Sequence, residues 1–475
     1  MTKDVDICII GGGAAGLVSA SGAAQLGLNT VLIEADKMGG ECLNSGCVPS
    51  KAILSAAHAA RSAGGKAEMG VTQTGDLKVD FKQVMTHVRS AIRAIEPHDS
   101  QERFEGLGAT VIRDWAKFTG PRAVEVGGET IRFKKAVIAT GSRPMVPPID
   151  GISEIDFLTN ETLWGLQDLP EHLLIIGGGA IGCEMSQAFR MLGAQVSLFE
   201  MGTLLGRVDP EAAQIVRDQF VADGIDVHEK TSVTQLTKLA DGRIKLSYQR
   251  NGDSGDVIGT HVLVAAGRTV KTDTLDLAAA GVERNQRGII VDSRLRTSNK
   301  RIYAVGDCNG EYQLTHAAGH EAGQFIKSAL FKIPTGISRA GMVHVTYTNP
   351  EVAQAGRTEA EARAEFGEDI EVLSAGYDHN DRAIAEGKTN GIAKLILSPK
   401  GKVLGASITG AHAGELIHLW ALAIAKGLKP RDISSYIAPY PTFSEVNKAL
   451  ISSYFQDRLF APRTRRLVRF LNIFS

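Results

Sequence analysis

The chain has 475 residues, of which 43% are apolar and 22% charged, and its formal net charge is −1 at pH 7. This length predicts about three domains, and the near-zero charge argues against general binding of nucleic acid. The sequence begins without a signal-peptide pattern and has no apolar run long enough to span a bilayer, so we expect a cytoplasmic protein.

The first predicted unit is a strand, a glycine-rich turn, a helix and a second strand that ends in the acid Glu34. In the turn, Gly11 permits a tight bend, Gly13 lets the backbone approach a pyrophosphate, and Gly16 lets helix and strand pack closely. The helix N-terminus favours a phosphate, and Glu34 would accept hydrogen bonds from a ribose diol. A single unit of this kind can also be a plain structural turn.

Two cysteines, Cys42 and Cys47, follow this unit. Disulfide-bonded cysteines have Cα atoms within about 7 Å, whereas residues five apart in a straight helix are separated by roughly 8–9 Å. The pair can therefore form a disulfide only where a helix is distorted at its start, and Gly46 and Pro49 favour a helix that begins here. The positive end of that helix would stabilise a thiolate. The other cysteines, predicted to be buried apolar residues, are Cys8, Cys183 and Cys308.

The strand, turn, helix and strand recur between His172 and Glu200, with Gly177, Gly179 and Gly182 in the turn. In both copies the acid follows the third glycine at the same spacing, which indicates two dinucleotide sites. A carboxylate at Glu200 binds a free 2′-hydroxyl and repels a 2′-phosphate, so we expect NAD(H) rather than NADP(H). The alternative is an exposed acid without a ligand.

The predicted fold is α/β, with two doubly wound, Rossmann-like dinucleotide-binding domains and a C-terminal α+β domain. Residues 1–149 and 275–340 are assigned to the first domain, 150–274 to the second and 341–475 to the third. The third domain has no glycine-rich turn of this type and mixes strand-like runs with a helix near residues 414–426.

The segment from Cys42 to Lys51, coming after a dinucleotide-binding unit, closely resembles the class I pyridine nucleotide-disulfide oxidoreductases, which include dihydrolipoamide dehydrogenase, glutathione reductase and mercuric reductase. The resemblance covers nearly the whole chain, and Glu200 and the loop between the cysteines are most similar to the dihydrolipoamide dehydrogenase branch. Further matching segments are 139–141, 306–307, 314–316, 349–353 and 441–445.

The resemblance implies FAD at the first site and NADH at the second, with hydride passing through the flavin to a Cys42–Cys47 disulfide. Cys47 would face the flavin and Cys42 the substrate, and Lys51 and Glu184 would form a pair beside flavin N5. The residues implied to bind FAD are Gly11, Gly13, Gly16, Glu34, Lys51, Ala116, Thr140, Gly141, Asp307, Thr315 and Ala317. Those implied to bind NAD are Gly177, Gly179, Gly182, Glu200, Val233 and Gly267. No metal site is predicted.

The resemblance also implies a homodimer formed by the C-terminal domain, whose segment around Pro441 to Glu445 completes the active site of the partner. Disulfide-reducing members carry a His directly before this segment, oriented by the Glu. Here the position is Tyr440, with Glu445 retained. Mercuric reductases resemble the chain in having Tyr, but they carry a C-terminal cysteine pair and this chain has no cysteine after Cys308.

Three functions remain open from the sequence. The leading one is an FAD-dependent, NADH-linked disulfide oxidoreductase of the dihydrolipoamide type. The first alternative, favoured by Tyr440, is a mercuric-reductase-like enzyme that reduces a metal ion, a quinone or another small acceptor. The second is a redox-responsive flavoprotein that binds a partner and turns over slowly.

The C-terminal segment 463–474 combines four arginines with large apolar residues. In a helix, Leu467, Phe470, Leu471 and Phe474 would lie on one face. The pattern indicates either a helix packed on the dimer or a weak contact with a membrane surface or a protein partner.

Overall fold

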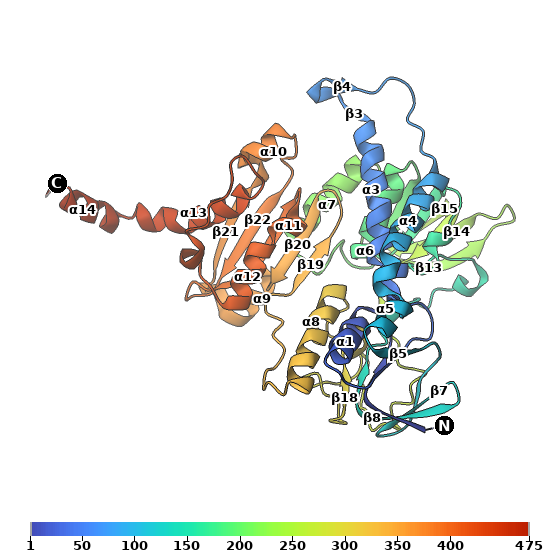
Figure 1. Cartoon of the computed structure of the whole chain (residues 1–475). Coiled ribbons are helices and arrows are strands. Elements are labelled where there is room, and N and C mark those ends of the chain that lie inside the picture. Colours follow the sequence, from blue (N-terminus) through green and yellow to red (C-terminus); the bar gives the residue numbers. More distant parts are fainter. Residues whose placement is uncertain (1, 474–475) are drawn as a thin grey trace.

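The computed structural model describes residues 2–473, in three sheet-based units. In Figure 1 the N-terminal unit lies at the bottom, the second unit, in green, lies on the right and the C-terminal unit, in orange, lies on the left. The α/β fold predicted from the sequence, with two Rossmann-like units and a C-terminal α+β unit, is confirmed.

The first unit is a sheet in the order β5-β2-β1-β8-β7-β6, with β18 also paired to β8. Its parallel strands are β1 (Thr2–Ile10), β2 (Thr30–Ile33), β5 (Ala109–Ile112), β8 (Glu129–Ile138) and β18 (Ile302–Ala304). The antiparallel strands β6 (Lys117–Gly120) and β7 (Ala123–Val126) extend it. Every residue of β1 from Ile7 to Ile10 is buried, as expected for a central parallel strand covered on both faces.

The second unit repeats this pattern in a parallel sheet of order β12-β11-β10-β16, covered by α6 (Ala180–Met191) and α7 (Pro210–Ala222). Its strands are β10 (His172–Ile176), β11 (Gln195–Phe199), β12 (Asp226–His228) and β16 (His261–Val264). A separate antiparallel sheet contains β13 (Thr231–Lys238), β14 (Ile244–Arg250) and β15 (Asp253–Gly259).

The chain crosses from the first unit to the second at β9 (Ser142–Pro144) and returns at β17 (Arg268–Val270). These short strands pair with each other in antiparallel register, with Ser142 opposite Val270. The two crossings therefore lie side by side and hold the two nucleotide-binding units together. The exact domain limits at 149, 274 and 340 stay a prediction.

The third unit is an antiparallel sheet of order β19-β20-β23-β22-β21. Its strands are β19 (Val343–Thr346), β20 (Glu351–Gly356), β21 (Glu371–Gly376), β22 (Ile392–Leu397) and β23 (Val403–Gly410). Its helices are α9 (Glu359–Phe366), α10 (Asp381–Ala385), α11 (Ala413–Leu416), α12 (His418–Lys426) and α13 (Glu445–Leu459), followed by α14 (Pro462–Leu471). The helix predicted near residues 414–426 is thus divided, with a break at Ile417.

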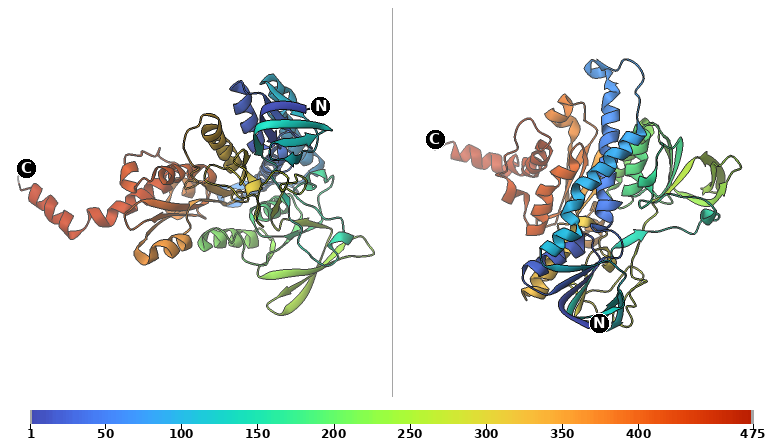
Figure 2. Two further views of the ribbon diagram at one scale, coloured as in Figure 1. Left: turned by 90° about the horizontal axis from the view of Figure 1, so that it is seen from below. Right: turned by 45° about the vertical axis from the view of Figure 1, so that its right-hand side comes forward.

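Five α-helices lie between the first glycine turn and β5, and they run through the middle of the molecule (Figure 1). They are α1 (Ala14–Gln25), α2 (Gly40–Asn44), α3 (Cys47–Ala63), α4 (Phe81–Asp99) and α5 (Gln101–Gly106), and a small hairpin of β3 (Gly65–Lys66) and β4 (Val71–Thr72) lies between α3 and α4. Figure 2 shows α3 and α4 as adjacent long helices. Ile53 and Leu54 of α3 share one apolar core with Phe81 of α4 and Phe189 of α6, which fixes α3 against the second unit.

Cys8, Cys183 and Cys308 are fully buried, as predicted. Within residues 2–473, no helix combines the length and the apolar character needed to cross a membrane.

Candidate active site

The first glycine turn provides an open backbone site at the N-terminus of α1. Gly11 has φ +111°, and a Cβ on Gly16 would lie 1.8 Å from the Gly11 carbonyl oxygen, so both positions require glycine. A Cβ on Gly13 would meet only Gly40, at 3.7 Å. No side chain caps α1, and its first turn has no acid, so its N-terminal N–H groups are available to a phosphate.

The second turn has the same geometry at the N-terminus of α6. Gly177 also has φ +111°, a Cβ on Gly182 would lie 1.8 Å from the Gly177 carbonyl oxygen, and Gly179 faces open space. No side chain caps α6. Two matched turns at uncapped helix N-termini fit two dinucleotides.

The acids at the two strand ends are held in the same way. Glu34 accepts hydrogen bonds from the N–H groups of Gly12 and Asp36, at 2.6 and 2.7 Å. Glu200 accepts hydrogen bonds from the N–H groups of Gly178 and Gly202, both at 2.7 Å. Each carboxylate is therefore fixed beside its glycine turn, where it can meet a ribose.

Several other predicted FAD residues lie at the carboxyl ends of β8 and β18, the end at which open α/β sheets bind ligands. The Thr140 hydroxyl donates to the Lys271 carbonyl at 2.5 Å, and Gly141 has φ +70°. Asp307 accepts a hydrogen bond from Ser142, and burial raises the pKa of the Asp307 carboxyl. Thr315 is the first residue of α8 (Thr315–Phe325), and Ala317 is buried in its first turn.

Three predicted nucleotide residues lie outside this group. The Ala116 methyl is buried in the apolar core with Phe118, which leaves its backbone as the part able to contact a nucleotide. Val233 is half-buried on β13, opposite Tyr248. Gly267 has φ +134° and its carbonyl accepts a hydrogen bond from the Met145 N–H.

The two cysteines lie on either side of a break between helices. Cys42 is in α2, which ends at Asn44, and Cys47 is the first residue of α3. Gly46 between them has φ −117° and ψ −107°, outside the helical region. This break places the two free thiols close enough for each to shift the pKa of the other. The predicted distortion at the start of a helix is confirmed.

Cys47 is placed to be a thiolate. Its Sγ lies 3.3 Å from the Thr315 hydroxyl, at the N-terminus of α8. The hydrogen bond from Cys42, followed by that from Thr315 and the charge of Lys51, lowers the pKa of Cys47 to about 6. The same contact with Cys47, together with burial, raises the pKa of Cys42 above its usual range. Cys47 is therefore largely a thiolate at pH 7.

Lys51 and Glu184, predicted as a pair, form an ion pair of 2.8 Å between α3 and α6. The Glu184 side chain is only 6% exposed, and its other oxygen accepts the Tyr347 N–H at 3.0 Å. The Lys51 amino group lies 4.2 Å from the centre of the Tyr347 ring. The pair therefore connects both nucleotide-binding units to the third unit.

A second ion pair, between Glu41 and Arg268, was not predicted from the sequence. Two guanidinium nitrogens of Arg268 donate to the Glu41 carboxylate, one at 2.6 Å, and Asn160 donates to it at 2.7 Å. The Arg268 Nε donates to the Ser142 hydroxyl at 2.8 Å. In the sequence, the one sign that Glu41 belongs to the site was its position directly before Cys42. Its partners Asn160 and Arg268 come from distant segments and could not be identified there.

Tyr440 and Glu445 lie in the third unit. Tyr440 is 72% exposed, and its hydroxyl donates to Asp381 at 2.9 Å, which raises the pKa of Tyr440. Glu445 begins α13 and lies 3.9 Å from the Lys448 amino group. Among the described residues of one protomer, no hydrogen bond joins Tyr440 to Glu445 or to Cys47.

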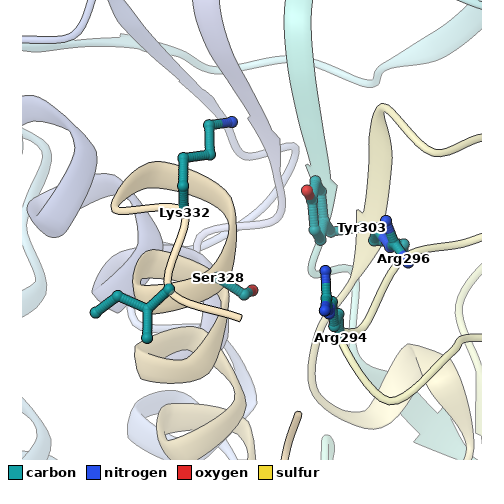
Figure 3. A pocket seen from close by; sticks show the side chains of 6 residues that line it. Arg294, Arg296, Tyr303, Ser328 and Lys332 are labelled. Atoms are coloured by element: carbon teal, nitrogen blue, oxygen red, sulfur yellow. The ribbon is translucent and has the colours of Figure 1, made fainter. Parts of the chain in front are cut away.

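A pocket of about 190 Å³ lies elsewhere on the first unit (Figure 3). It is lined by the side chains of Arg294, Arg296, Tyr303, Ser328, Lys332 and Ile333. Ser328 belongs to the helical turn after α8, whereas Thr315 at the other end of α8 contacts Cys47. The pocket is therefore separate from the dithiol. Within residues 2–473, no group of three or more His, Cys, Asp or Glu side chains could hold a metal ion.

Comparison with known proteins gives one consistent result. Residues 5–322 match the family described as pyridine nucleotide-disulphide oxidoreductase, and residues 342–451 match its dimerisation domain.

Among curated relatives, the mercuric reductase of Lysinibacillus sphaericus is 34% identical over 456 residues, covering 95% of this chain and 83% of the relative. The dihydrolipoyl dehydrogenase of Bacillus subtilis is 33% identical over 451 residues, covering 93% of this chain and 95% of the relative. A similar solved structure is a Cu(II) complex of the HOCl-induced flavoprotein disulfide reductase RclA from Escherichia coli. Its TM-score is 0.85 and its identity 26%, with 95% of this chain and 100% of that chain covered.

Proposed function

Because the chain belongs to the pyridine nucleotide-disulphide oxidoreductase family, we propose that it is a cytoplasmic NADH-dependent reductase whose Cys42–Cys47 pair passes electrons to a small acceptor. The family makes it a homodimeric flavoprotein that uses FAD and NAD(P)H. The coenzyme preference, the roles of individual residues and the acceptor are the proposed parts.

The observation that carries the proposal is the difference between the two thiols. Two electrons and one proton convert a Cys42–Cys47 disulfide into a Cys47 thiolate and a Cys42 thiol. The low pKa of Cys47 and the raised pKa of Cys42 match these two products. Cys47 is fixed between the N-termini of α3 and α8, which leaves Cys42 as the thiol that reacts with the acceptor.

FAD bound at the first site would supply two-electron transfer from the nicotinamide to the disulfide. The chain supplies binding and charge. The glycine turns and the two acids would hold the dinucleotides. The proposed FAD-binding domain is 1–149 plus 275–340, the NAD-binding domain is 150–274, and the interface domain is 341–475. Lys51, fixed by the buried Glu184, places a positive charge near Cys47 and so stabilises its thiolate.

NADH is the proposed coenzyme because Glu200 occupies the place where a 2′-phosphate would lie. Both Glu200 oxygens are held by backbone N–H groups, so the carboxylate cannot easily turn away from a phosphate. A fixed negative charge there disfavours NADPH.

The acceptor is proposed from Tyr440. In the dimer, we place Tyr440 and Glu445 of one protomer beside Cys42 of the other. A Tyr hydroxyl that donates to Asp381, with a raised pKa, is a poor base for a dithiol substrate at neutral pH. This observation favours the mercuric-reductase-like alternative, in which a thiophilic metal ion, a quinone or another small acceptor is reduced at Cys42. The similarity to mercuric reductases points the same way.

Steady-state NADH oxidation with lipoamide, glutathione disulfide, Hg(II), Cu(II) and quinones, one at a time, tests the proposal. We expect turnover with at least one acceptor and its loss in both Cys42→Ser and Cys47→Ser. Full turnover in Cys42→Ser would contradict the role of the dithiol. No turnover with any acceptor would favour the slow, partner-binding flavoprotein.

A further inference from the structure

Helix α14, at the C-terminus, has two chemically distinct faces. Arg465, Arg466 and Arg469 share one face of its ten residues, the fourth arginine, Arg463, lies at the edge of the apolar face, and the helix contains no acid. Its side chains are not buried: Leu467, Val468 and Leu471 are 56%, 50% and 57% exposed. No ion pair within residues 2–473 involves any of the four arginines, so their charge is not neutralised by the described part of the protomer.

The position of α14 separates it from the rest of the molecule. Figure 1 and both views of Figure 2 show α14, in red, projecting beyond the C-terminal unit. The match to the family's dimerisation domain ends at residue 451, before this helix begins. Leu459 and Phe460, which precede α14, are also exposed, whereas Phe474, expected on its apolar face, lies outside the described residues.

We propose that α14 binds the surface of an anionic lipid bilayer, with its axis in the plane of the interface. This inference goes beyond the reductase function. Exposed Leu, Val and Ile side chains can enter the boundary of the acyl chains, while guanidinium groups remain among the phosphates and form paired hydrogen bonds with them. The protein has a net charge of −1, so attraction to anionic lipid arises from this local cluster rather than from the whole molecule.

The length and composition of α14 favour surface binding over insertion. Ten residues are too few to span a bilayer, and four arginines would be costly at its centre. A protein partner would have to cover both the apolar face and four unpaired cations. An anionic lipid surface satisfies both requirements at once.

The test uses the full-length, FAD-loaded dimer in co-sedimentation with lipid vesicles. Vesicles contain either phosphatidylcholine alone or phosphatidylcholine with about 30 mol% phosphatidylglycerol, at about 0.05 M and about 0.5 M NaCl. We expect binding to the anionic vesicles at low salt, with much weaker binding at high salt and to neutral vesicles. Leu467→Glu combined with Leu471→Glu, and separately Arg465→Gln with Arg466→Gln and Arg469→Gln, should each weaken binding about tenfold or more.

A matched control variant removes three positive charges elsewhere on the surface by combining Arg122→Gln, Arg250→Gln and Arg287→Gln. It should bind as the native protein does. The native protein failing to bind anionic vesicles, or the control losing as much binding as the arginine variant, would overturn the proposal. Light scattering must also show that both tail variants stay dimeric, because dissociation would identify α14 as a contact between two copies of the chain instead.

Discussion

At the residue scale, the main determinant of the chemistry is the environment of Cys47. Its pKa is lowered first by the hydrogen bond from Cys42, then by Thr315 and by the charge of Lys51. Two helix N-termini also meet at this sulfur, since Cys47 begins α3 and Thr315 begins α8. Because the pKa is lowered, the thiolate is present above about pH 6 and is lost by protonation as the pH falls through that value.

The first prediction follows from this order of causes. After anaerobic two-electron reduction, a charge-transfer absorption band between the Cys47 thiolate and FAD should appear and should fade on acidification with a midpoint near pH 6. Cys42→Ser should show the band without reduction, because Cys47 then has no partner for a disulfide, and serine keeps a hydroxyl donor for the thiolate. Cys42→Ala removes the donor and should move the midpoint upward, and Cys47→Ser should abolish the band. The same midpoint in the Ala and Ser variants would contradict this account of the pKa.

Tyr440 is the residue at which the chain departs most clearly from the disulfide-reducing pattern. A His in this place, with an ordinary pKa near 6.5, can take a proton from a dithiol at neutral pH. The structure adds a reason why Tyr440 cannot, since its hydroxyl donates a hydrogen bond to Asp381, which raises the pKa of Tyr440.

The second prediction is weak turnover of dihydrolipoamide by the native enzyme at neutral pH, rising as the pH increases towards the raised pKa of Tyr440. Tyr440→His should increase this activity at neutral pH by about tenfold or more, because positioned acid–base groups typically contribute 10²–10⁴-fold. Asp381→Asn should shift the pH profile to lower pH by removing the negative charge beside Tyr440. High native activity at neutral pH would show that another group, such as His316 or His412, supplies the base.

At the element scale, the strand, turn and helix units could be predicted from the sequence because their signals are local. Gly11 and Gly177 both adopt φ +111°, and the acids Glu34 and Glu200 both bind the turn beside them. The helix start at Cys47 was predictable for the same reason. In contrast, the bond between Glu41 and Arg268 joins residues 227 positions apart, and no local pattern encodes it.

The third prediction concerns the matched acids. Glu200→Gln removes the charge but keeps an acceptor for a turn N–H, so the preference for NADH over NADPH in kcat/KM should fall by about tenfold or more. Glu200→Arg should narrow or reverse the preference. Glu34→Gln is the control, since the equivalent change at the first turn should weaken FAD retention and leave the coenzyme preference unchanged. Equal use of both coenzymes by the native enzyme would contradict the role of Glu200.

The fourth prediction concerns the contact between α2 and β17. The side chains of Glu41 and Arg268 are 22% and 15% exposed, and Glu41→Gln leaves Arg268 only the more distant carboxylate of Asp307, at 3.8 Å. Removing the sole partner of a buried charge costs about 3–5 kcal/mol, so this partial loss should lower stability by less than that but by more than about 1 kcal/mol. The half-exposed pair of Arg143 and Asp273 is the control, and Asp273→Asn should cost under about 1 kcal/mol. Thermal midpoints of the FAD-loaded dimers compare the two variants. Equal shifts would show that the buried pair has no special role.

At the scale of the whole molecule, the site is assembled from segments that the sequence places far apart. Tyr347 of the third unit meets the Lys51–Glu184 pair, and Gln187 of α6 exchanges hydrogen bonds with Asn349. These contacts could not be predicted because they depend on how the units pack. The resemblance to the family did predict the third unit's part in dimerisation, and the match of residues 342–451 confirms it.

The central claim is that the Cys42–Cys47 pair is a working redox element in addition to the flavin. Anaerobic titration with NADH, followed by flavin absorbance, tests it most directly. The native protein should accept about two NADH equivalents per FAD, since flavin and disulfide each take two electrons, whereas Cys42→Ser and Cys47→Ser should accept about one. A native protein that accepts only one equivalent, as the two variants do, would contradict the claim.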